Sequence, residues 1–190
     1  FDYRMVMFCN LGPESGRTSE TLATLLGDIN KLNVFIVVGA VRNSPEWNYY
    51  NSVASQEHSH MAVMEMNPTD NLNVRTALAG SDILFAANPT EPSASMILKS
   101  LACGTIPLTG RDVGCANLLT NYVGDFSTAN AMLVDDSAAP DQMIRKFKNA
   151  VQLYNSNPES WNYLVRNAYQ FRYEWDRTIS QYLITFGESA

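Results

Sequence analysis

The chain has 190 residues, of which 46% are hydrophobic and 17% charged, a balance typical of a globular α/β domain and not of a disordered chain. Its net charge of −6, with lysines and arginines scattered along the sequence, argues against a nucleic-acid-binding surface. No apolar run approaches the ~20 residues that span a bilayer, so we expect no membrane insertion.

Short apolar runs alternate with segments of helical periodicity along the chain. The runs predict strands at 5–9, 34–38, 61–64, 83–87, 105–109 and 132–134. Helices are predicted from a cap at Thr18 or Ser19 to Leu32, from Pro45, over 70–78, between Pro92 and Gly104, and over 140–154, 158–171 and 176–186. This alternation predicts one α/β domain over 1–190, a Rossmann-like open parallel sheet of about six strands flanked by helices. We expect the first strand to be central and the helices of 140–186 to complete the domain.

A carboxylate, Glu91, follows the buried run at 83–87. The residues Asn88-Pro89-Thr90 break the strand, and Pro92 suits the first turn of a helix because its missing N–H is not needed there. Ligands of doubly wound sheets bind outside the carboxyl ends of the strands, which makes Glu91 a candidate functional residue. The alternative is a surface carboxylate at a helix N-terminus, where the helix dipole favours negative charge.

Two motifs around this position resemble a known family. Glu91-Pro92-Ser93-Ala94-Ser95, and Gly104-Thr105-Ile106-Pro107 with the basic loop that follows, are similar to E-P-C-G-L-T-Q and G-T-V-P-V-V-R-R-T-G-G-L of starch and glycogen synthases. Further motifs lie in the family's order at 34–39, 78–84 and 150–182. The resemblance implies a retaining glycosyltransferase of the GT-B architecture, in which two Rossmann-like domains enclose a nucleotide sugar. This chain would be the C-terminal lobe.

The resemblance also implies an activity and a set of site residues. The lobe would bind ADP-glucose or UDP-glucose, without a further cofactor, for extension of an α-1,4-glucan. Glu91 would be the catalytic candidate that positions the glucose, and Arg111 and the backbone of Gly114 would lie near the diphosphate. The acceptor site would belong to an N-terminal lobe that this chain does not contain. An intracellular location, in cytoplasm or plastid, is expected.

The donor-phosphate site departs from the family's pattern. The family's first loop reads G-R-L-x-x-Q-K-G, and here Asn10 stands at the Arg position and Ser15 at the Lys position. A departing diphosphate needs cations or aligned N–H groups, so both replacements predict a weakened site. Arg17 is a candidate substitute for one lost cation, the alternative being a solvated arginine near a helix start. Val113 and Ala94 also stand where the family has glycines.

Two alternatives to an active enzyme stay open. One is a degenerate lobe, a pseudoenzyme that serves as a structural subunit with another lobe or other proteins as partners. The other is a nucleotide-binding module unrelated to transferases, although no G-x-G-x-x-G follows the first strand. The chain begins at Phe1 without Met and is expected to be a fragment or a processed piece.

Cysteine and histidine usage predicts no metal site. Cys9, Cys103 and Cys115 form no C-x-x-C pair, which disfavours a zinc site or a disulfide framework and favours a reducing compartment. His58 and His60 lie in a polar segment without neighbouring cysteines, where a surface turn is the favoured interpretation.

Overall fold

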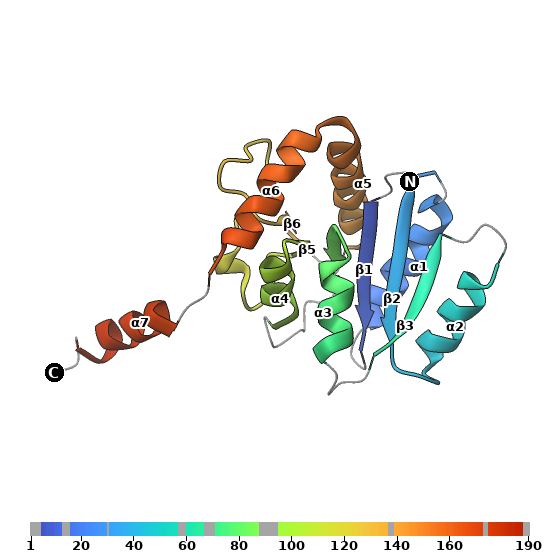
Figure 1. Ribbon diagram of the computed structural model, residues 1–190, viewed down its shortest axis with the longest axis horizontal. Coiled ribbons are helices and arrows are strands. Elements are labelled where there is room, and N and C mark those ends of the chain that lie inside the picture. The colour runs from blue at the N-terminus through green and yellow to red at the C-terminus, as the bar shows by residue number, and fades with distance from the viewer. Residues whose placement is uncertain are drawn as a thin grey trace.

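The structure is a computed structural model that describes residues 5–12, 16–29, 31–56, 60–66, 71–87, 95–136, 139–172 and 175–187. These residues form an alternating series of strands and helices (Figure 1). The elements are β1 (Met5–Leu11), α1 (Gly16–Ile29), β2 (Val34–Ala40), α2 (Pro45–Ala54), β3 (Met61–Glu65), α3 (Asn71–Ala79), β4 (Ile83–Phe85), α4 (Ser95–Cys103), β5 (Ile106–Gly110), the 3-10 turn η1 (Ala116–Leu118), β6 (Met132–Val134), α5 (Pro140–Ser156), α6 (Pro158–Gln170) and α7 (Trp175–Gly187).

The strands form one parallel sheet in the order β3-β2-β1-β4-β5-β6. β1 pairs with β2 from Met5 opposite Val34 to Leu11 opposite Ala40, and β4 lies on its other side. The predicted open parallel sheet with an inner first strand is therefore confirmed. Because the chain runs outward from β1 to β3 and then returns to β4, the strand order reverses between β1 and β4. Such a switch point is where doubly wound sheets bind ligands.

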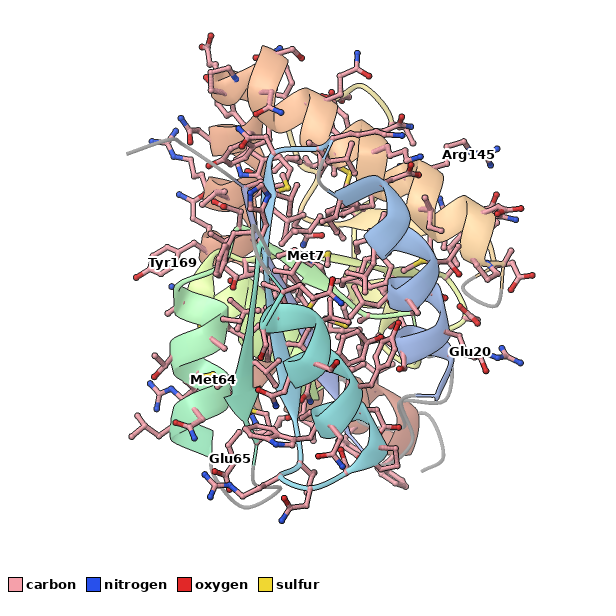
Figure 2. The ribbon with its side chains drawn as sticks, turned by 90° about the vertical axis from the view of Figure 1, so that its right-hand side faces the viewer. Met7, Glu20, Met64, Glu65, Arg145 and Tyr169 are labelled. Carbon is pink, nitrogen blue, oxygen red and sulfur yellow. The ribbon has the colours of Figure 1, made fainter. Side chains whose placement is uncertain are left out.

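Helices cover both faces of the sheet. Met7 and Cys9 of β1 belong to a buried cluster with residues of α1, α2 and α5, whereas Phe8 packs with Leu78 of α3 and half-buried residues of α4. This division follows from the alternation of side chains along a strand. Figure 2 shows α3 on one side of the strands and α1 on the other. The sheet is thus buried on both faces, as its continuous apolar runs predict.

Several element boundaries differ from the predictions. α1 begins at Gly16, before Thr18, which is buried and lies within the helix. The ladder between β1 and β2 extends through Leu11 and Ala40, beyond the apolar runs, because parallel pairing continues there. β4 ends at Phe85. The predicted helix start at Pro92 lies outside the described residues, and α4 is described from Ser95.

Helix α7 lies apart from the sheet and its covering helices (Figure 1). Ile179, Tyr182, Leu183 and Phe186 follow the i, i+3, i+4, i+7 spacing of one helical face, and all four are exposed. Such a stripe normally packs against another surface. Within the described part of the chain, no helix is both long and apolar enough to cross a membrane.

The tight packing of β2 against its neighbours leads to a stability prediction at Gly39. A Cβ atom there would lie 2.7 Å from Cγ and Cε of Met66 and 3.1 Å from Cε2 of Phe8. We expect Gly39→Ala to lower the free energy of unfolding by about 1–3 kcal/mol, measured by urea denaturation, because these buried side chains must shift. The control is Gly27→Ala in α1, where no described atom lies within 4 Å and helix propensity should add about 0.5–1 kcal/mol. A Gly39→Ala variant as stable as the parent would contradict the packing described.

Candidate functional site

The switch point lies where β1 and β4 end, and doubly wound sheets bind their ligands in a crevice at such a point. Asn10 lies half-buried in β1 opposite Gly39, and α1 begins at Gly16 directly beyond. Neither α1 nor α4 carries an acidic residue in its first turn, unlike α2, which has Glu46 there. The first N–H groups of a helix and its dipole attract anions. Among the described residues, the first turns of α1 and α4 therefore hold no carboxylate, and Glu91, which precedes α4 in the sequence, lies outside these residues.

The predicted site residues divide into three groups. Asn10 and Arg17 lie at the β1–α1 connection, Arg17 exposed in the first turn of α1 and without an ion pair to any described residue. Arg111 and Gly114 lie in the loop after β5. Ser15 and Glu91 lie outside the described residues, so their roles remain predictions.

Arg111 is held toward the edge of the sheet. Its backbone N–H donates to the Val134 carbonyl at 2.9 Å, and its Nε donates to Oδ1 of Asp135 at 3.0 Å. Arg111 directly follows β5 and Asn10 lies in β1, and β4 separates these two strands. The structure thus brings Arg111 together with the end of β6. Its proposed place beside a diphosphate stays a prediction.

The loop after β5 explains one departure from the family pattern. Val113, which stands where the family has a glycine, is 5% exposed and belongs to the hydrophobic core. Gly114 is exposed, and a Cβ atom there would meet no described atom within 4 Å. Val113 therefore serves to anchor the loop, while the backbone at Gly114 is sterically open to a ligand.

Three residues that the sequence interpretation missed lie near these groups. The Thr109 hydroxyl, at the end of β5, is buried and has no hydrogen-bond partner among the described residues. Arg145 and Lys146 of α5 line a cavity together with Arg111. Burial, and then the positive charge of Arg111, lower the pKa of Lys146. No local pattern in the sequence marks these residues, because only the packing of α5 on β6 brings them to Arg111.

Cys9 in β1 is not suited to nucleophilic chemistry. Burial raises the pKa of its thiol far above the ordinary value, so the reactive thiolate is disfavoured. The described residues contain no cluster of histidine, cysteine, aspartate and glutamate that could hold a metal ion. The N-termini of α1 and α4 are the described features at the switch point that favour an anionic ligand.

Comparison with known proteins connects this geometry to glycosyltransferases. No protein-family model matches the chain. The chain is 29% identical over 111 residues to a glycogen synthase of Desulforudis audaxviator, covering 58% of this chain and 22% of the relative. It is 27% identical over 105 residues to a glycogen synthase of Photobacterium profundum, covering 55% of this chain and 20% of the relative. The matched region thus spans about a fifth of these relatives' length.

Solved structures share the fold. The catalytic domain of starch synthase IV from Arabidopsis thaliana, bound to ADP and acarbose, superposes with a TM-score of 0.73 at 18% identity, over 98% of this chain and 38% of that chain. The C-terminal domain of the group 1 glycosyl transferase LpcC from Francisella tularensis superposes with a TM-score of 0.56 at 12% identity, over 88% of this chain and 82% of that chain.

The fold is therefore that of a Rossmann-like lobe of the GT-B glycosyltransferases. Within that class, the sequence relatives confirm the predicted resemblance to the C-terminal lobe of the starch and glycogen synthase family.

Proposed function

We propose that the chain is the nucleotide-sugar-binding lobe of a glycosyltransferase similar to starch and glycogen synthases. The whole protein would transfer glucose from ADP-glucose or UDP-glucose to an α-1,4-glucan. The proposal rests on the agreement between the glycogen synthase relatives and the superposition on a starch synthase whose structure holds ADP. The N-termini of α1 and α4 follow β1 and β4 at the switch point, and the first N–H groups of such helices favour a bound diphosphate.

The family resemblance supplies the roles of the residues. Glu91 would position the glucose, and Arg111 with the Gly114 backbone would contact the diphosphate. Asn10, Ser15 and Arg17, at the connection between β1 and α1, would face the phosphates, and two family cations are replaced there. Negative charge develops on the leaving diphosphate in the transition state, so the missing cations would reduce catalysis more than binding.

A degenerate lobe with a structural role is the second candidate. The replacement of both cations favours it, and so does the exposed apolar stripe on α7, defined by Ile179, Tyr182, Leu183 and Phe186. In the family the C-terminal segment crosses back to the other lobe. An N-terminal lobe or another subunit would accordingly cover the stripe in either candidate function.

Calorimetric titration of the complete protein with ADP-glucose and UDP-glucose tests the proposal. We expect one of the two donors to bind, and Glu91→Gln to weaken that binding by about 10–100-fold, as expected for one hydrogen bond to a charged group. The matched control is Glu20→Gln, which removes a carboxylate from an exposed position of α1 and should leave donor affinity unchanged. The absence of heat with either donor at millimolar concentration would reject the enzyme in favour of the structural subunit.

A further inference from the structure

A cavity lies at the edge of the sheet, away from the switch point. It has a volume of about 320 Å³ and is bounded by the ends of β5 and β6, one face of α5 and the segment around Asn121. We propose that this cavity, the β6–α5 pocket, binds the phosphate group of a small phosphorylated molecule. The inference goes beyond the function proposed for the crevice, because Arg145 and Lys146 have no role there and only Arg111 is common to the two.

Positive charge is concentrated in the β6–α5 pocket. Arg111, Arg145 and Lys146 line it, against the single carboxylate of Asp135. The chain as a whole carries a net charge of −6, so three cations around one cavity differ from its average composition. The three cations come from the loop after β5 and from α5, which the fold brings together over a sequence separation of more than 30 residues.

Several N–H donors of these three cations have no acceptor among the described residues. Lys146 Nζ donates to the Tyr122 carbonyl at 3.0 Å, which holds the ammonium group in the pocket. Arg111 uses Nε for Asp135, and its two terminal nitrogens have no partner among the described residues. Arg145 makes no hydrogen bond or ion pair within the described part of the chain, and Figure 2 shows it projecting from α5 at the surface. A phosphate group has the oxygen acceptors that these donors lack.

Repulsion among the cations of the β6–α5 pocket also favours a phosphate group as the ligand. Burial lowers the pKa of Lys146, and the charge of Arg111 lowers it further, with Asp135 opposing. The pocket therefore holds like charges close together in a partly desolvated place. A bound dianion would relieve that repulsion, whereas a neutral or cationic ligand would not.

The remaining lining suits a small hydroxylated molecule attached to the phosphate. Gln142 and Asn149 share the face of α5 that carries Arg145 and Lys146, at i, i+3, i+4 and i+7 spacing. Their amides can bond to hydroxyl groups, and Val123 and Leu133 add an apolar wall. The volume is at the lower end of the ~300–1,000 Å³ typical of small-molecule sites, which favours a compact ligand.

The β6–α5 pocket is distinct from the crevice. β6 is an edge strand, and β4 and β5 separate it from β1. At about 4.8 Å between strands, the end of β6 lies roughly 14 Å from the end of β1. Arg111 is the one residue assigned to both sites, and Arg145 and Lys146 of α5 belong to the pocket alone.

Calorimetric titration with glycerol 3-phosphate, inorganic phosphate and glycerol tests the proposal on the purified protein. We expect glycerol 3-phosphate to bind and glycerol not to bind. The double variant R145Q/K146Q should weaken the binding of glycerol 3-phosphate at least tenfold. R145Q alone should weaken it about three- to tenfold, at an exposed position that makes no hydrogen bond or ion pair with a described residue. Binding of inorganic phosphate as tight as that of glycerol 3-phosphate would identify free phosphate as the ligand and overturn the assignment to an ester.

The control separates a local site from a general effect of charge. R75Q/R166Q removes two arginines from exposed positions of α3 and α6, so it changes the net charge by the same amount. We expect it to leave glycerol 3-phosphate affinity unchanged. Equal losses in both double variants, or no heat with either phosphate at 10 mM, would overturn the proposal. Circular dichroism of each variant verifies that the fold is retained. If K146Q disturbs the structure by removing the contact with Tyr122, the result of R145Q alone decides the test.

Discussion

Glucan synthesis by the complete protein should be slow or absent, and Asn10→Arg combined with Ser15→Lys should tighten the binding of its nucleotide sugar at least tenfold. A hydrogen bond to a charged group contributes about 1.5–3 kcal/mol. Two restored cations should therefore improve the binding free energy of the nucleotide sugar by several kcal/mol at most. Asn10 lies at the carboxyl end of β1, beside the N-terminus of α1, where an added guanidinium would stand at the crevice. Because leaving-group charge is greatest in the transition state, turnover should rise by more than affinity.

Calorimetry and a glucan-synthesis assay measure the two effects. The control is Ala23→Arg combined with Gln152→Lys, which adds the same charge at exposed positions of α1 and α5. We expect no change in donor affinity from this control. An unchanged affinity in the crevice variant would mean that the pocket itself has been lost. Rapid turnover in the parent protein, abolished by Glu91→Ala, would show that the two missing cations are not needed for catalysis.

Phe147→Ala should lower the free energy of unfolding by about 3–5 kcal/mol, the usual cost of emptying a buried aromatic site. The Phe147 side chain is fully buried and meets Phe85 of β4 edge to face, with 6.0 Å between the ring centroids. It therefore fixes α5 on the sheet. Since α5 also carries Arg145 and Lys146, this contact positions one wall of the β6–α5 pocket.

Urea denaturation followed by circular dichroism gives the measurement for Phe147→Ala. The same substitution at Phe186 in α7 is the matched control, since that side chain is 68% exposed and should change stability by less than about 0.5 kcal/mol. A comparable loss at both positions would contradict the placement of Phe186 on an exposed face. A stable Phe147→Ala variant would contradict the packing of α5.

The sequence by itself determined the layered architecture. Apolar runs such as 83–87 are local signals, and helical periodicity between them identifies the covering helices, so alternation alone predicts a parallel sheet. The motifs around Glu91 likewise carried the resemblance to starch and glycogen synthases, because a motif is a property of neighbouring residues. Strand ends were less well predicted, since the ladder at Leu11 and Ala40 depends on pairing between strands.

Only the tertiary structure shows which partners the charged side chains contact. Arg111 pairs with Asp135, and Lys146 reaches the Tyr122 carbonyl, over separations of 24 residues each, because β5, β6 and α5 pack side by side. Val113 turns out to be a core residue, although its position in the motif suggested a phosphate loop. The face of α7 is equally ambiguous in sequence, since its apolar spacing is the same for a packed and an exposed helix. Contacts of this kind arise from the packing of distant segments, which leaves no periodic signal along the chain.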